Sequence, residues 1–373
     1  MNDPRLEKLA RLVIKYSLAI KPGDTICLQG NAIAGPMIQE LYRAALHAGA
    51  HVETQIGIGG LREMFLKEAK RQQLTRVSSF NTYRFRHLDA YVSILSSENT
   101  KALSGTDPKR QALAQAAQEK LTRMIFRRVA KGEFRWVAIP WPCQAYAQDA
   151  EMSLSEYEDF VYDALCLSDV DPIKTWKRIS RQQKALVDYL DKTQRVRIVA
   201  ENTDLTLMYK GRKWINCDGR QNLPDGEVYT SPIENSAEGH ISFSYPAVFG
   251  GREIQDVHLF FKKGIVTRIE ATRGTEALKA LLSMDRGASR IGEVAFGTNY
   301  RIQRYVKNTL FDEKIGGTIH IALGASLPET GGKNYSALHW DMVCDLRGGG
   351  EIIIDGEVIN RDGRFINKRF PQT

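Results

Sequence analysis

The residues with the clearest chemical potential are an imidazole and a carboxylate that flank a tryptophan. His339 and Asp341 stand two positions apart, and on a β-strand this spacing turns both side chains to the same face. Such a pair can chelate one metal ion. His320 lies in a second apolar run (TIHIALG, 318–324) that also predicts a strand. A single histidine in such a run is more often a hydrogen-bonded core residue than a ligand.

Two glutamates stand in similar surroundings. Glu227 and Glu293 each follow a glycine and precede apolar residues. A carboxylate buried there needs a partner, because an unpaired buried charge is very costly. A metal ion is one such partner and a Lys or Arg side chain is the other, and the spacing leaves both open.

Several familiar catalytic signatures are excluded by inspection. The sequence has no His-Glu-x-x-His, no Walker phosphate loop and no Gly-x-Ser-x-Gly, to which GASLP at 324–328 is a near miss. GNAIAG at 30–35 lies between a predicted strand and a predicted helix, but its glycines lack the dinucleotide-binding spacing and indicate a structural turn. We therefore expect the chemistry in the second half of the chain.

The first half of the sequence alternates strands and helices. Predicted strands at 24–30 and 51–56 enclose a helix at 36–47, and predicted strands at 88–95 and 134–139 enclose helical sequence at 109–131. This alternation is typical of an α/β domain with a mostly parallel sheet covered on both faces.

The pattern changes after a predicted helix at 171–192. Strands follow one another at 196–200, 205–209, 241–245, 257–261 and 265–271, before a helix at 275–285, and Asp-Gly pairs at 218–219, 225–226 and 355–356 predict hairpin-type turns. We expect an α/β domain over 1–194 and an α+β domain rich in antiparallel strands over 195–373. The second domain would carry the metal site.

Composition narrows the class of protein. The 373 residues include 52 Lys and Arg against 44 Asp and Glu, for a net charge of +8. The basic residues lie largely on the predicted helices at 109–131 and 171–192, which we interpret as solvated faces, so nucleic acid is not an expected partner.

No apolar run approaches the roughly 20 residues of a membrane span. The five cysteines are scattered without a Cys-x-x-Cys pair, which favours packed thiols in the cytoplasm.

Five segments together resemble a known family. They are GEVY at 226–229, IGEVA at 291–295, TLFDEK at 309–314, HIALG at 320–324 and HWD at 339–341. In this order they are similar to the motif series of the thermophilic aminopeptidase family of metallopeptidases, of the aminopeptidase T, aminopeptidase S and PepS type. The resemblance is specific over about 220–345.

The resemblance implies a metal-dependent hydrolase that removes the N-terminal residue of a peptide with a free N-terminus, and a homodimer. It implies two divalent ions of Zn, Co or Mn per chain, with Glu293 as the bridge between them. Carried over to this chain, the metal ligands are Glu227, Glu293, His320, His339 and Asp341, with Glu313 as a sixth candidate.

Two residues would complete the catalysis that the family implies. Glu313 would move a proton from the activated water to the leaving amine. The family has a tyrosine seven residues after the first histidine, where this chain has Leu327. We expect Tyr335 to take the place of that tyrosine, unless this chain is a catalytically impaired metal-binding homologue.

Two other functions compete with peptide hydrolysis. His320, His339 and Asp341 alone would form a two-histidine, one-carboxylate triad for a single Fe(II), as in ring-cleaving oxygenases, and dihydroxypyridine dioxygenases are similar to this family. That triad would not need Glu227 and Glu293. The other competitor is a non-catalytic protein that binds nucleic acid through its basic helices.

Overall fold

The computed structural model describes residues 3–249 and 252–372, and it divides the chain into two compact units. The first comprises Met1–Ile173 with Gly219–Leu223, and the second comprises Lys174–Asp218 with Pro224–Thr373. The long helix α10 (Pro172–Leu190) lies almost wholly within the second unit. The expected boundary between 194 and 195 falls after this helix and stays a prediction.

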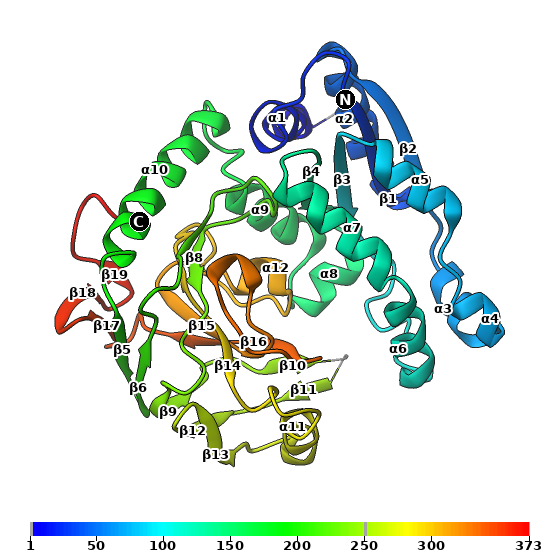
Figure 1. Cartoon of the computed structure of the whole chain (residues 1–373). Helices are drawn as coiled ribbons and strands as arrows, with labels where there is room; N and C mark the ends of the chain where they lie inside the picture. The colour runs from blue at the N-terminus through cyan, green and yellow to red at the C-terminus, as the bar shows by residue number, and fades with distance from the viewer. Residues whose placement is uncertain (1–2, 250–251, 373) are drawn as a thin grey trace. The chain divides into compact units, whose positions relative to one another are not determined.

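The first unit contains a four-stranded parallel sheet (Figure 1). Its strands are β1 (Thr25–Asn31), β2 (His51–Gly57), β3 (Ala90–Leu95) and β4 (Arg135–Pro140), in the order β2-β1-β3-β4. All four were expected from the sequence, and the α/β class of this half is confirmed.

Helices cover both faces of this sheet. Ile38 of α2 lies beside Gly30 on one face, and Phe85 of α5 and Val129 of α7 pack with Cys27 on the other.

The helical sequence at 109–131 forms two helices, and three helices between β2 and β3 were not predicted. The helical elements are α1 (Pro4–Leu12), η1 (Val13–Ser17), η2 (Ala32–Ala34), α2 (Gly35–His47), α3 (Leu61–Glu68), α4 (Arg71–Leu74), α5 (Ser79–His87), α6 (Pro108–Ala117), α7 (Glu119–Ala130), α8 (Gln144–Asp149) and α9 (Leu154–Ala164).

The second unit is built on two antiparallel sheets, which confirms the antiparallel-rich character expected for this half. The larger sheet has the order β13-β12-β9-β6-β5-β17-β18-β19. Its strands are β5 (Arg195–Ala200), β6 (Thr203–Met208), β9 (Glu238–Ser242), β12 (His258–Lys262), β13 (Ile265–Glu270), β17 (Glu351–Ile354), β18 (Glu357–Arg361) and β19 (Arg364–Phe365). A separate pair is formed by β10 (Ala247–Phe249) and β11 (Arg252–Ile254).

The smaller sheet has five strands and carries the candidate site. Its order is β16-β15-β14-β8-β7. The strands are β7 (Ile215–Cys217), β8 (Glu227–Thr230), β14 (Ile291–Gly297), β15 (Thr318–Gly324) and β16 (His339–Asp345). The two sheets and α10 share one hydrophobic core, and the other helices of the unit are α11 (Thr275–Leu282), α12 (Thr309–Asp312) and η3 (Pro328–Thr330).

Two details of the second half differ from expectation. The strand expected at 241–245 is β9, three residues earlier, because its pairing with β6 and β12 places Glu238 and Gly239 in the sheet. Of the three Asp-Gly pairs, the pair at Asp355 alone closes a two-residue hairpin, between β17 and β18, and Asp355 has the positive φ that such a turn requires. The pairs at 218 and 225 lie in the longer connection between β7 and β8.

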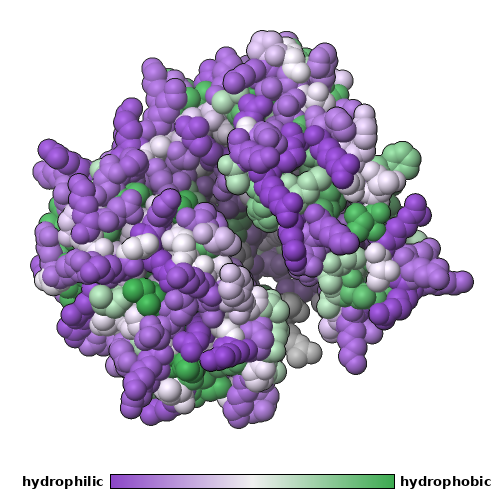
Figure 2. Space-filling model, viewed as in Figure 1, coloured by the Kyte–Doolittle hydropathy of each residue, from purple (hydrophilic) through white to green (hydrophobic). Residues whose placement is uncertain are grey.

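Hydrophilic side chains cover most of the face in Figure 2. Basic residues of α6 and α7, such as Lys109, Lys120, Arg123 and Arg127, are exposed, as expected for solvated faces. None of the helices in the described ranges combines the length and the apolar composition that a bilayer crossing requires.

Candidate metal centre

One face of the five-stranded sheet gathers the predicted ligands. Glu293 of β14 and Asp341 of β16 both pair with Ala322 of β15, which lies between them. Glu227 pairs with Gly297 at the end of β14. Directly paired residues of neighbouring strands share a face. His320 and His339 therefore project from the same face as the three carboxylates, which is what the two-residue spacing on β16 predicted.

The opposite face of these strands is apolar. Val294, Ile321 and Met342 alternate with the ligands along the chain and belong to the core. On the ligand face, Ala295 pairs with His320, and Ala322 lies between Glu293 and Asp341. These small side chains leave space beside the polar ones, so the alternation that builds the core also builds the site.

A bulge at Gly292 places Glu293 on the ligand face. Ile291 pairs with Leu323 in the core, and the register shifts before Glu293, so these two residues face opposite ways although they are two positions apart. Glycine is needed because a Cβ at position 292 would lie 2.2 Å from the carbonyl oxygen of Ala325.

The ligand atoms form a continuous series across the sheet. Glu293 lies at its middle, with Oε1 3.5 Å from Nε2 of His320 and Oε2 3.3 Å from Nε2 of His339. His320 Nε2 is also 3.7 Å from Oε2 of Glu227, and His339 Nε2 is 3.6 Å from Oδ1 of Asp341. Each oxygen of Glu293 thus lies near a different histidine, as expected for a carboxylate that bridges two metal sites.

Both histidines are oriented by backbone carbonyls. Nδ1 of His320 lies 3.1 Å from the carbonyl oxygen of Glu313, and Nδ1 of His339 lies 3.0 Å from that of Ala325. A proton on Nδ1 that is donated to a carbonyl leaves Nε2 with a free lone pair in the neutral ring. This is the outer hydrogen bond that orients metal-ligating histidines.

The electrostatics of the series favour a cation. Burial alone would raise the pKa of Glu293, yet the two imidazoles lower it to about 2. Burial would lower the pKa of each histidine, but the carboxylates raise it to about 10 for His320 and about 9 for His339. Burial and the charge of Glu313 raise the pKa of Asp341 to about 7. Protons and metal ions therefore compete for the same atoms.

The residues present fit a metal ion. Ligand atoms of Glu293, His339 and Asp341 all lie within 4.8 Å of one another, and Oδ1 of Asp341 is buried without a hydrogen-bond partner. We call these three residues the Asp341 end of the site. Oxygen and imidazole donors without thiolate suit Zn, Co or Mn.

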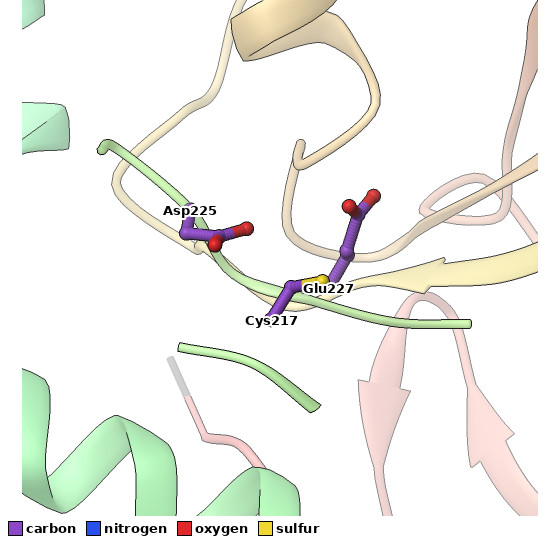
Figure 3. Close-up of side chains that lie close together, drawn as sticks. All are labelled: Cys217, Asp225 and Glu227. Carbon is purple, nitrogen blue, oxygen red and sulfur yellow. The ribbon is translucent and has the colours of Figure 1, made fainter. Parts of the chain in front are cut away.

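A second group lies at the start of β8. Cys217, Asp225 and Glu227 also have ligand atoms within 4.8 Å of one another (Figure 3). Burial raises the pKa of the Cys217 thiol well above its ordinary value, so an ion at this sulfur would have to displace a tightly held proton. The other four cysteines are buried.

The structure adds one charged residue that the sequence did not reveal. Lys314 follows α12, its side chain is 0% exposed, and its Nζ lies 2.6 Å from Oε2 of Glu313 and 3.5 Å from Oε1 of Glu227. Burial would lower the pKa of this ammonium, but the two glutamates raise it well above its ordinary value. Glu227, Glu313 and Lys314 form the Lys314 end of the site. The only sequence signal was the requirement that a buried glutamate have a cationic partner.

The two predicted catalytic residues differ in position. Glu313 lies at the site and lines a cavity of about 90 Å³ together with Asp341 and Tyr245. Tyr335 is not brought to the cluster, since its side chain is 88% exposed, and its role stays a prediction. Leu327 is held by a hydrogen bond from its N–H to Oγ of Ser231 and offers no polar side-chain group.

Comparison with known proteins identifies the family of this chain. The chain matches the thermophilic metalloprotease (M29) family over residues 2–365. It belongs to that family. The predicted resemblance is therefore confirmed, and it extends well beyond the segments that suggested it. Aminopeptidase 2 of Geobacillus stearothermophilus is 27% identical over 97% of this chain and 95% of its own length.

Solved structures support the fold. Wild-type AmpT from Thermus thermophilus matches with a TM-score of 0.85 and 25% identity over 98% of this chain and 99% of that one. A 2,5-dihydroxypyridine dioxygenase from Pseudomonas putida matches with a TM-score of 0.63 and 13% identity over 98% of both chains, a likeness of fold alone.

Proposed function

We propose that this protein is a metal-dependent aminopeptidase that hydrolyses the N-terminal residue of peptides. Membership of a metalloprotease family and relatives named aminopeptidases support this function. The observation that carries it is the Asp341 end, where two carboxylates and an imidazole converge beside a cavity that reaches Asp341. A divalent ion bound there would lower the pKa of a bound water and polarise the scissile carbonyl.

The chain's own residues divide the remaining work. Ala325 orients His339, and the bulge at Gly292 presents Glu293, so the ligands are positioned before an ion arrives. The Glu313 carboxylate lines the same cavity as Asp341 and can hold a proton and move it to the leaving amine. The free amine of the substrate is a cation that suits this acidic surrounding.

The finer points of the prediction rest on the resemblance. It implies two ions, of which Glu227 and His320 would help to hold the second, and it implies a homodimer, whereas the cytoplasm is expected from the scattered cysteines. The distances of Nε2 of His320 to Glu293 and to Glu227 support Glu227 and His320 as members of the site. The Fe(II) alternative is less well supported, because the group around His339 and Asp341 contains Glu293 in place of His320.

The test is hydrolysis of a panel of aminoacyl reporter substrates by metal-stripped protein, with and without added Zn, Co or Mn. We expect activity that depends on the added metal and that is lost in Glu293→Gln. N-acetylated substrates serve as the matched control and should not be cleaved. Equal activity in Glu293→Gln would refute the role of Glu293, and no cleavage of any free-amine substrate would refute the function.

A further inference from the structure

We infer that the ammonium of Lys314 occupies the place of the second divalent cation, so that each chain binds one divalent ion, held at the Asp341 end. The inference rests on the proposed function in taking this sheet face as the metal site. It changes the expected number of ions and identifies the residue that sets it.

The first step is the position of Lys314. Its side chain is fully buried, and its Nζ stands between two glutamates, one of which is the predicted ligand Glu227. The backbone around it is fixed, since its N–H donates to the carbonyl of Phe311 and its carbonyl accepts from the N–H of Asn299. The ammonium is therefore part of the built site and not a surface charge that swings in.

The second step is charge. A divalent ion on Glu227 would share this carboxylate with the ammonium, and like charges that close repel strongly in a buried setting. Expelling Lys314 would not remove the cost, because it would leave a charged side chain without its partners inside the unit. The Lys314 end thus already contains one fixed positive charge, supplied by the chain itself, between its two carboxylates.

The third step is the contrast with the Asp341 end. In residues 3–249 and 252–372, the basic partners of Glu293 and Asp341 are the two histidines alone. An imidazole can bind a metal ion through Nε2, whereas an ammonium has no lone pair to offer. Oδ1 of Asp341 and Oε2 of Glu227 are both buried without a hydrogen-bond partner, so the contrast between the two ends lies in the fixed ammonium. The Asp341 end therefore has atoms that can bind a metal ion, and within these ranges it has no lysine or arginine that occupies their place.

The fourth step concerns the remaining group. Cys217 and Asp225 offer ligand atoms near Glu227, but any ion there would again share Glu227 with Lys314. The geometry thus points to a single place for a divalent ion among the described residues.

The experiment counts ions. Protein stripped with a chelator is reloaded with Zn or Co, desalted, and measured for metal per chain by mass spectrometry, with the visible absorption of Co as a second readout. We expect saturation at one ion per chain for the unaltered protein. Saturation at two ions, or no retained ion, would overturn the inference.

Two substitutions locate the cause. Lys314→Met keeps most of the length of the side chain and removes its charge, so it should raise the count to two. The matched control Lys333→Met, at an exposed position, should leave the count at one. A folded Lys314→Met protein that still binds one ion would overturn the inference. If that variant does not fold, Glu227→Gln decides: a count of one supports the inference, and loss of an ion contradicts it.

Peptide hydrolysis measured on the same samples separates this inference from the proposed function. Two ions with hydrolysis would overturn the inference and leave the function standing. One ion per chain without hydrolysis of any free-amine substrate would refute the proposed function and leave the inference about Lys314 standing.

Discussion

The two ends of the candidate metal centre are alike in their carboxylates and differ in what neutralises them. At the Lys314 end, Glu227 and Glu313 face a buried ammonium supplied by the chain. At the Asp341 end, Glu293 and Asp341 face an imidazole that can give up its proton. Both ends obey the rule that a buried carboxylate needs a cation. The difference shows how one sheet face can contain both a permanent positive charge, the lysine ammonium, and a site for a metal ion that can bind and leave.

The largest expected effect comes from removing a ligand at the Asp341 end. Asp341→Asn keeps the shape of the side chain and removes its charge, so we expect metal affinity to fall by more than about 100-fold, the upper range for loss of an outer partner of a ligand. Isothermal titration with Zn measures this. Asp362→Asn is the control, in an exposed turn with φ of 51° that asparagine tolerates. Unchanged affinity in Asp341→Asn would remove Asp341 from the site.

A change at the Lys314 end should separate turnover from binding. In Glu313→Gln the metal content should stay the same, while kcat falls by about 100-fold or more, because a positioned proton carrier contributes on that order. Steady-state kinetics beside metal analysis check this. A loss of metal in this variant would instead make Glu313 a ligand.

The pH dependence of metal binding should also distinguish the two ends. The pKa of His339 is raised to about 9 and that of Asp341 to about 7, so binding at the Asp341 end must release one proton between pH 7 and 9. Below pH 7 a second proton must leave. Affinity should therefore fall about tenfold per pH unit from 9 to 7, and more steeply below.

This pH profile can be measured by titrating metal-stripped protein with Zn in buffers of different ionisation enthalpy. An ion at His320, whose pKa is raised to about 10, would release a further proton throughout this range. The imidazole of His339 and one metal-bound water together release at most two protons at pH 8, so a release of three protons per chain would contradict a single ion at the Asp341 end.

The smallest expected effect is structural. Gly292→Ala would bring a Cβ against the carbonyl of Ala325, and we expect it to lower the free energy of unfolding by about 1–3 kcal/mol and to weaken metal binding by displacing Glu293. Gly348→Ala is the matched control, because a Cβ there meets nothing within 4 Å. Thermal unfolding of both variants tests this, and equal stability would show that the bulge tolerates a side chain.

Much of the fold could be predicted because its signals are local. Strands β1, β3 and β4 of the parallel sheet have apolar residues between clear turns, and His339 and Asp341 reveal their shared face by spacing alone. Helix α5 was missed because it buries no residue, so it has no apolar periodicity to detect. Strand β9 was displaced because its edge is set by pairing with β6 and β12.

The parts of the site that could not be predicted depend on tertiary contacts. Lys314 ends a short motif, and nothing in its neighbours tells that its side chain turns inward to Glu227. The bulge before Glu293 is equally hidden, since a glycine in a strand has several causes. Tyr335 was chosen as a substitute by its residue type, but it lies on an exposed connection between η3 and β16.

The most direct test of the central claim is anomalous diffraction from crystals of the protein loaded with Zn or Co. The account predicts one strong peak per chain, at about 2.0–2.2 Å from donor atoms of Glu293, His339 and Asp341, with Lys314 still between Glu227 and Glu313. A peak of equal strength on Glu227, or no peak at Asp341, would contradict it.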